Sequence, residues 1–416
     1  MQDKDTTQST FSQVFNPILS KEVWSKIKQA TPTLDKRVKK LTAQRLVVLV
    51  ANAQIQEFSA LKAISGSVSN ADLSQNIGLE SISSSTISRR LRELPSRVVE
   101  QLFQNTIHRL GLRKGFTTIK QTLGNLNMID SSTVSLCLSR YRWAEFRKTK
   151  GGVKLHLRLK FDGDAYPDKA VITPAKTADR KLLDELIVED EQAINVFDRG
   201  YVDYKKFDEY CEKGIRFVSR LKENAVIEFV GERPVEEEGP IEEDVDVILG
   251  TKATRMKHEL RVITVYDSEN KPVTIVTDIF DLSKEEIADI YRYRWQIELF
   301  FKWLKQHAQI KHFYGLSPAA VINQLLIALL TYCMLLLLKL EAYYEGQLLT
   351  IQRQLRACLF EPYHEFLRKL FAKHGKSSRG RKRRQRHATF FVATMLQVLR
   401  GDTEMLNSTL YDPLIL

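Results

Sequence analysis

Between residues 125 and 221 the sequence alternates short apolar runs with amphipathic helical patterns, and few folds accommodate this alternation. Residues 125–130 and 194–198 are apolar runs that each end in an aspartate. Residues 153–161 alternate apolar and basic side chains with a period of two, as in a strand with one buried and one positive face. Together with a helical pattern over 204–213, these runs predict an α/β sheet covered by helices.

The first 118 residues have long helical periodicity and few β-branched runs, so residues 1–118 are predicted to form a helical N-terminal DNA-binding domain. Residues 72–79 read as a helix followed by a glycine turn, and residues 84–94 as a helix that starts with hydroxyl caps. This is the outline of a helix-turn-helix DNA reader, with Arg89 and Arg90 as expected DNA contacts. Any capped basic helix after a glycine turn gives the same outline, so a packing role is the alternative.

Residues 223–280 interrupt the alternation with β-rich pieces around an acidic loop. They predict an insertion inside the α/β catalytic core, which is placed at 119–222 and 281–345. The acidic loop, residues 231–246, is interpreted as a solvated face that repels DNA. Residues 346–416 are predicted to be a helical, basic C-terminal region.

Residues 319–340 form an apolar segment nearly long enough to span a bilayer. Asn323 and Gln324 interrupt it, and no second segment resembles it, so a buried core helix is predicted rather than a membrane span. The polar N-terminus does not resemble a signal peptide. Four scattered cysteines without zinc-site spacing fit reduced, buried thiols in a cytoplasmic protein.

The net charge of +12 and the pI of about 9.3 indicate a polyanionic partner, nucleic acid first and an anionic membrane second. Residues 140–160 carry eight Lys/Arg and one acid, and residues 376–386 carry seven Lys/Arg and no acid. The second run is interpreted as a phosphate-contacting loop, with a surface solubility feature as the alternative. Its expected DNA contacts are Arg381, Lys382, Arg383 and Arg384.

Residues 291–305 follow a helical pattern and carry a single acid among four basic residues. Four side chains fall within about 60° of one another on an ideal helix: Tyr291, Arg294, Glu298 and Lys305. One face would present a hydroxyl, a guanidinium, a carboxylate and an ammonium, which suits a site that holds a metal ion and grips phosphates beside it. The simpler interpretation is a solvated amphipathic helix with an i,i+4 ion pair.

Asp130 and Asp198 each end an apolar run and precede a turn, and strand ends at one sheet edge are where α/β domains place chemistry. With Glu298, three carboxylates could converge to bind two divalent metals for phosphodiester chemistry, one acid bridging both ions. Mg²⁺ needs only a few carboxylates besides water and phosphate oxygens. Taken singly, a strand-terminal aspartate is more often a cap or turn former. Other acids could serve instead: Asp162, Asp164 and Asp278.

At these residues the chain resembles the DDE transposases of bacterial insertion sequences, specifically the family named after insertion sequence four. That family's signature is Tyr, two residues, Arg, three residues, Glu, six residues, Lys, and residues 291–305 match it without a gap. The first family aspartate follows an apolar strand, as in Met128-Ile129-Asp130-Ser131. The second lies in Asp-Arg-Gly-Tyr, which is residues 198–201 here. Thr277-Asp278 also looks familial, and the resemblance covers nearly the whole chain.

The resemblance implies a ribonuclease H-like catalytic domain with a β-rich insertion before the glutamate. It implies Asp130, Asp198 and Glu298 as ligands of two Mg²⁺ ions, with Mn²⁺ as a substitute. Arg294 and Lys305 would contact phosphates, and Tyr291 would position DNA. The expected partners are double-stranded DNA, as terminal inverted repeats and target, and a second copy of the chain in a synaptic homodimer.

The implied activity is cut-and-paste transposition by a cytoplasmic protein that associates with the bacterial nucleoid when it binds DNA. The enzyme would cleave the element ends and join the freed 3′-hydroxyls to target DNA. Two alternatives stay open: a non-catalytic DNA-binding derivative of a transposase, and a ribonuclease H-like nuclease that cuts without joining. The intact acids argue against a non-catalytic derivative. The long N-terminal domain and the basic tail argue against a nuclease that only cuts.

Overall fold

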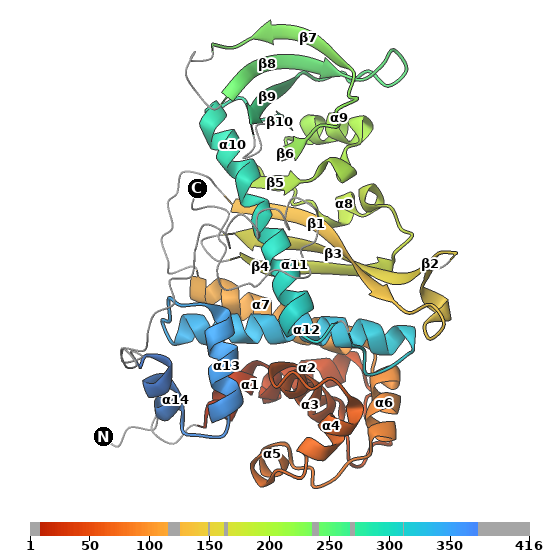
Figure 1. The fold of residues 1–416 in the computed structure, drawn as a ribbon, viewed down its shortest axis with the longest axis vertical. Coiled ribbons are helices and arrows are strands. Elements are labelled where there is room, and N and C mark those ends of the chain that lie inside the picture. The colour runs from red at the N-terminus through yellow and green to blue at the C-terminus, as the bar shows by residue number, and fades with distance from the viewer. Residues whose placement is uncertain are drawn as a thin grey trace, which may run out of the picture. The chain divides into compact units, whose positions relative to one another are not determined.

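The protein is represented by a computed structural model (Figure 1). It describes the following residues: 9–114, 125–148, 150–161, 165–234, 241–266, 271–310 and 312–372. The chain forms two compact units that interleave along the sequence, whereas the domains predicted from the sequence mostly follow one another. The helical unit contains Met1–Arg90, Phe301–His312 and Leu330–Leu416. The sheet unit contains Leu91–Phe300 and Phe313–Leu329.

Within the described residues, ten strands of the sheet unit form one sheet in the order β2-β3-β1-β5-β6-β10-β9-β8-β7, with β4 also paired to β3. The mixed α/β class predicted from the sequence is therefore confirmed. The strand bounds are β1 Asn125–Leu136, β2 Glu145–Arg147, β3 Lys150–Phe161, β4 Ala165–Pro174, β5 Ala193–Phe197, β6 Arg216–Arg220, β7 Ile227–Glu232, β8 Ile241–Leu249, β9 Leu260–Tyr266 and β10 Pro272–Thr277.

The centre of the sheet is parallel and its outer parts are antiparallel. β1 runs parallel to β5, and β5 runs parallel to β6, whereas β3 is antiparallel to β1 on the other side. All five residues of β5 are buried, as expected for a parallel strand covered on both faces. Asp130 and Asp198, which end the two apolar runs, lie at the end of the pairing between β1 and β5 in this centre.

β1 is longer than the sequence predicted, because it continues past Asp130 to Leu136. Its pairing with β5 ends at Ile129, but its pairing with β3 continues to the end of the strand. The ladder with β3 pairs the six residues from Ser131 to Leu136, so the strand continues there without a turn. Asp130 therefore marks the point where β1 leaves β5, and the expectation that it ends the strand was wrong.

The helices surround this sheet or pack in the helical unit (Figure 1). Their bounds are α1 Thr10–Leu19, α2 Lys21–Ala30, α3 Ala43–Ile55, α4 Leu61–Ser67, α5 Ala71–Ile77, α6 Ser84–Glu93, α7 Ser96–Lys114, α8 Leu183–Leu186, α9 Tyr204–Lys213, α10 Lys284–Tyr293, α11 Trp295–His307, α12 Pro318–Glu341, α13 Leu348–Cys358 and α14 Tyr363–Leu370.

An aromatic cluster fixes α9 against the parallel strands. Phe207 of α9 lies with its ring centroid 4.5 Å from that of Phe217 in β6, and Phe197 of β5 stacks against Phe217. These three rings are fully buried in the core of the sheet unit. Burying side chains of this size stabilises the packing by about 2 kcal/mol each, so the strand ends next to Phe197 and Phe217 have a rigid base.

The predicted insertion, residues 223–280, extends the same sheet rather than forming a sheet of its own. β10 pairs antiparallel with β6 of the core, and β9, β8 and β7 follow it in order. The Thr277 hydroxyl donates to the Phe217 carbonyl at 2.6 Å, and Asp278 accepts from the Phe217 amide at 2.7 Å. The insertion is therefore hydrogen-bonded into the core at the Thr277-Asp278 motif.

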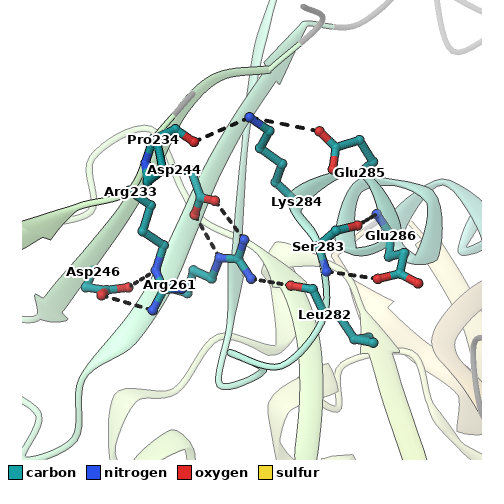
Figure 2. A network of polar contacts seen from close by, with 10 residues as sticks. All are labelled: Arg233, Pro234, Asp244, Asp246, Arg261, Leu282, Ser283, Lys284, Glu285 and Glu286. Atoms are coloured by element: carbon teal, nitrogen blue, oxygen red, sulfur yellow. Dashed lines mark hydrogen bonds and ion pairs between the residues drawn. The ribbon is translucent and has the colours of Figure 1, made fainter. Parts of the chain in front are cut away.

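Figure 2 shows how the insertion holds the start of α10. The buried Arg261 donates through Nε and Nη2 to both carboxylate oxygens of Asp244 at 2.7 Å, and through Nη1 to the Leu282 carbonyl at 2.6 Å. Ser283 and Glu286 then form a capping box on the helix. Asp244 belongs to the acidic loop that was interpreted as solvated, so at this position the interpretation was wrong.

The apolar segment 319–340 forms α12, which is long and apolar enough to cross a membrane. In its most apolar window 89% of the residues are buried inside the structure, which is the behaviour of a core helix. Asn323 is satisfied internally, donating to the carbonyls of Leu91 and Leu94. The prediction of a buried core helix is confirmed. All four cysteines are free thiols, but only Cys333 and Cys358 are buried, so the expectation that all four are buried was wrong for the exposed Cys137 and the half-buried Cys211.

Candidate active site

The register of the parallel strands places three side chains in a row. Ile129 pairs with Phe197, and Phe197 pairs with Ser219. Asp130 and Asp198 directly follow the last paired residues of β1 and β5, and Arg220 follows Ser219 on β6. Neighbouring strands lie about 4.8 Å apart. Asp130, Asp198 and Arg220 form this row. The two predicted acids are thus adjacent, and Arg220 extends the row on β6.

Asp130 is a carboxyl group whose charge is poorly compensated. Burial raises its pKa to about 7, and the neighbouring acids Glu298 and Asp198 add to the shift. Arg294 and a 2.7 Å hydrogen bond donated by the Ser131 amide act in the opposite direction without cancelling it. A buried carboxylate with a raised pKa is typical of a site that receives a cation or transfers a proton.

Arg294 connects the third acid to the first. Its Nη2 donates to Oε1 of Glu298 at 2.8 Å, and its Nη1 lies 3.7 Å from Oδ2 of Asp130. The guanidinium side chain is only 13% exposed, and its Nε has no hydrogen-bond partner among the described residues. The guanidinium of Arg294 therefore contacts two of the three predicted acids, Glu298 and Asp130.

The helical pattern over 291–305 is almost continuous in the structure. α10 ends at Tyr293 and α11 begins at Trp295, with Arg294 between them in helical conformation. The Arg294 amide donates to the Tyr291 carbonyl at 3.1 Å, and the Ile297 amide donates to the Arg294 carbonyl at 3.2 Å. Both are i→i−3 hydrogen bonds, so the chain tightens locally instead of turning away. The single helix predicted from the sequence is therefore two helices joined at Arg294, and the i,i+4 relation of Arg294 to Glu298 is preserved.

Tyr291 lies on the last turn of α10 beside the same guanidinium. The Arg294 guanidinium carbon is 5.5 Å from the centroid of the Tyr291 ring. Burial raises the pKa of the Tyr291 hydroxyl, Asp198 raises it further, and Arg294 and Arg220 oppose the shift. Tyr291 thus belongs to the same electrostatic cluster as the acids and Arg220, and the phenol stays protonated at neutral pH.

The remaining predicted DNA contacts are spread over other parts of the chain. Lys305 lies on α11 seven residues after Glu298, about 10 Å further along the helix axis. Arg89 is exposed on α6, whereas Arg90 is buried and bonded to Asp35. A guanidinium held in this way supports structure rather than a direct DNA contact. Arg381, Lys382, Arg383 and Arg384 lie outside the described residues.

A polar network behind Asp130 was not predicted. The Ser131 hydroxyl donates to Oδ1 of Asp179 at 2.6 Å, and Lys154 Nζ lies 3.1 Å from the same oxygen. Lys154 is one of the basic residues of the alternating run 153–161, whose outer face was predicted to be positive. Arg158 on that face is also paired, with both oxygens of Asp168 at 2.8 Å. The period-two pattern located these cations, but it could not reveal the acids that neutralise them.

Two further buried groups border the same region. Burial raises the pKa of the Tyr201 hydroxyl, Asp130, Asp179 and Asp198 raise it further, and a side-chain hydrogen bond with Ser131 opposes the shift. Burial lowers the pKa of His156 to about 4, so its imidazole is neutral at physiological pH. The only sequence signal for Tyr201 was its place in the Asp-Arg-Gly-Tyr motif.

Asp278, the alternative acid that the structure describes, does not join this cluster. Asp278 is bonded to the Phe217 amide, and its pKa, raised by burial to about 7, is affected by Arg216 and Asp281 instead of the candidate site. Asp162 and Asp164 lie outside the described residues. Among the alternatives that the structure describes, none competes with Asp130, Asp198 and Glu298.

Three carboxylates form a donor set that suits a hard divalent cation. The raised pKa of the partly buried Asp130 carboxyl indicates a place where positive charge would be accommodated. In the part of the chain that the structure describes, no three His, Cys, Asp or Glu side chains are close enough to share an ion. In the same region the Arg294 guanidinium pairs with Glu298 and approaches Asp130.

The sequence family described as "Transposase DDE domain" matches residues 123–334, which include all three acids and Arg294. The chain belongs to this family of DDE transposases. It is therefore an enzyme of DNA strand cleavage and strand transfer, and enzymes of this class use divalent metal ions.

Two relatives are transposases of insertion sequences. A transposase for insertion sequence element IS5377 from Geobacillus stearothermophilus is 30% identical over 271 residues, covering 64% of this chain and 70% of that protein. One for insertion sequence element IS4SA from Synechocystis is 27% identical over 306 residues, covering 71% of this chain and 84% of that protein. The predicted relationship to insertion-sequence transposases is therefore confirmed.

A solved structure was also compared, the cryo-EM structure of a piggyBac transposase synaptic complex with hairpin DNA. It aligns with a TM-score of 0.43 and 12% identity, covering 89% of this chain and 84% of that chain. A likeness of this degree transfers no property, so the site is described from this chain's own residues.

Proposed function

We propose that this transposase binds the terminal inverted repeats of its insertion sequence, cleaves the element ends and joins the 3′-hydroxyls to target DNA by cut-and-paste transposition. The observation that carries the proposal is that Arg294 contacts both Glu298 and Asp130, which come from distant parts of the chain. Carboxylates and a guanidinium at one point suit a reacting phosphodiester, which needs both metal ligands and an anion contact.

The sheet unit is proposed to be a ribonuclease H-like core. The parallel centre β1-β5-β6, flanked by antiparallel β3 and β4, supports this assignment. The position of Glu298 on a helix after the β-rich strands also supports it. In this assignment Asp130 and Asp198 are contributed by neighbouring strands, and Glu298 comes to them from outside the sheet.

Asp130, Asp198 and Glu298 are proposed to hold two Mg²⁺ ions, for which Mn²⁺ substitutes. Such ions, when bound, lower the pKa of the attacking water or 3′-hydroxyl and stabilise the leaving oxygen. Arg294 would then turn its guanidinium from Glu298 to a phosphate of the DNA end. Tyr291 would orient that phosphate through its hydroxyl, and Lys305 would contact the backbone further along α11.

The remaining parts of the proposal concern assembly. The N-terminal helices would recognise the element end, and two copies of the chain would bring two ends together in a homodimer on double-stranded DNA. A protein of this kind would act in the cytoplasm and associate with the nucleoid when bound to DNA. The net charge of +12 supports a polyanionic partner.

A strand-transfer assay with the protein, an end duplex, target plasmid and Mg²⁺ tests the function. The expected result is nicking at the element end followed by end-to-target joined product. Cleavage without joining would instead assign a nuclease, and binding without cleavage would assign a regulatory DNA-binding derivative. Chelation of the metal should stop both reaction steps while end binding persists.

A further inference from the structure

Residues 35–41 of the helical unit, which we call the basic loop, connect α2 to α3 and carry four cations in five positions. Lys36, Arg37, Lys39 and Lys40 are all exposed. Crowding like charges in this way is unfavourable unless a partner of opposite charge binds them. The only acid of the loop is Asp35. The hydrogen bonds and ion pairs of Asp35 therefore decide whether it neutralises these cations or leaves them available to a partner.

Asp35 and Arg90 fix the two ends of the basic loop. Oδ1 of Asp35 accepts from Arg90 Nη2 at 2.5 Å, and Oδ2 accepts from the Ala43 amide at the start of α3 at 2.8 Å. Arg90 Nε donates at the same time to the Leu41 carbonyl at 3.0 Å. The single acid is therefore engaged inside the protein, and the loop is held in one shape with its cations outward.

The end of the basic loop forms one wall of a surface pocket of about 420 Å³. Lys39, Lys40 and Arg45 line this pocket from the loop and the first turn of α3, opposite Ser74, Gln75 and the residues after α5. Arg45 is oriented by a 2.7 Å hydrogen bond from its Nη1 to the Lys40 carbonyl. The one acid among the lining residues is Glu80.

A glycine gives the Arg45 guanidinium its place in the pocket. Gly78 ends α5 with φ +62°, and a Cβ on it would lie 2.9 Å from Nη2 of Arg45. The flat guanidinium therefore fits against bare backbone at this turn. The same turn leads to α6, which carries Arg90, so the pocket, the basic loop and the helix-turn-helix candidate are parts of one local structure.

We propose that this pocket and the basic loop form a site for backbone phosphates of duplex DNA, with Lys39, Lys40 and Arg45 as the contacts. Lysine and arginine with nearby hydroxyl and amide groups are the common phosphate ligands, and such contacts orient a reading helix on the duplex. Arg90 is then a positioning residue that holds the loop. The inference rests on the proposed function on DNA, and it adds a second DNA-binding site besides the candidate active site.

The test compares the full-length double variant Lys40→Gln/Arg45→Gln with the matched control Lys26→Gln/Lys28→Gln on exposed positions of α2. Fluorescence anisotropy measures binding to an end duplex and to an unrelated duplex of equal length over a salt series. Because each lost phosphate contact lowers the log–log salt slope by about 0.9, the pocket variant should lose about two units of slope on both duplexes. The control should keep the wild-type slope.

The outcomes separate this site from the function on which it rests. An unchanged slope in the pocket variant overturns the site, even if the wild-type protein nicks and joins element ends. A loss confined to the end duplex overturns the phosphate assignment, because backbone contacts carry no sequence information. If the wild-type protein binds both duplexes equally and cleaves neither, the proposed function fails, while the slope on the unrelated duplex still decides the site.

Discussion

Arg294 and Glu298 form an ion pair of 2.8 Å across one helical turn, and the same guanidinium reaches to 3.7 Å from Asp130. A helix pattern predicts an i,i+4 pair of this kind anywhere on a protein surface. Here the pair lies against a strand that carries another acid, so the arginine balances two carboxylates from different elements. Any cation that binds these carboxylates together must compete with Arg294.

Replacement of each proposed ligand should abolish chemistry without abolishing DNA binding. Asp130→Ala, Asp198→Ala and Glu298→Ala are each expected to reduce 3′-end nicking to below about one hundredth of wild type, since even residues behind a metal ligand contribute 10- to 100-fold. Asp289→Ala, on the half-exposed face of α10, is the control and should nick normally. Nicking of a labelled end duplex measures this, and near-normal activity in any of the three removes that residue from the ligand set.

The raised pKa of Asp130 predicts a pH-dependent stability. Its folded-state pKa of about 7 exceeds the unfolded value near 3.8, so ionisation costs the folded state increasingly as pH rises from about 4 to about 7. Asp130→Asn removes this cost. Its gain over wild type in metal-free urea unfolding should be larger at about pH 8 than at about pH 5, by at most about 3 kcal/mol. Equal gains at both pH values would show that the carboxyl is not destabilised by burial.

Asp179 is expected to stabilise the strand that carries Asp130. Asp179→Asn removes the charge opposite Lys154, whose side chain is only 14% exposed, while an acceptor for Ser131 remains. The free energy of unfolding should fall by about 1–2 kcal/mol, less than for a fully buried pair because Asp179 is partly exposed. Glu209→Gln breaks the exposed pair with Lys205 and serves as the control, expected within about 0.5 kcal/mol of wild type. A chemical denaturation midpoint unchanged in Asp179→Asn would exclude the stabilising role.

Lys305 should contribute one phosphate contact to the end complex. Lys305→Ala is expected to weaken end binding and to lower by about 0.9 the slope of the logarithm of the binding constant against the logarithm of salt concentration. The reason is that one fewer phosphate contact releases fewer counterions from the DNA. Lys302→Ala on the same helix provides the comparison for a general loss of positive charge. Filter binding across a salt series measures both, and equal slopes for Lys305→Ala and wild type would remove Lys305 from the phosphate contacts.

The sequence predicted those features that depend on local pattern. Period-two alternation located β3, the buried run before Phe197 located β5, and helical spacing related Arg294 to Glu298. The length of β1 was not predictable, because it depends on hydrogen bonds from a strand that lies later in the chain. Likewise the pairing of β10 with β6 is a long-range choice that no local pattern reveals.

The partners of charged side chains were the least predictable part. Arg90 and Arg89 are equivalent in sequence, but only Arg90 meets Asp35, which lies 55 residues earlier. Arg220 ends the strand β6, which neighbours β5, and a search for acids alone passed over it. A comparison of the residues at the ends of neighbouring strands, made without regard to their charge, would have found Arg220.

Because β10 borders β6, the β-rich segment is not a removable cassette. A shortened enzyme made by excising residues 223–280 would lose β10 together with the Thr277 and Asp278 bonds to Phe217, and would expose the flank of β6 two strands from Asp130. Such an open flank invites pairing with other chains. Engineered truncations should therefore spare β10 and rejoin the chain on its N-terminal side.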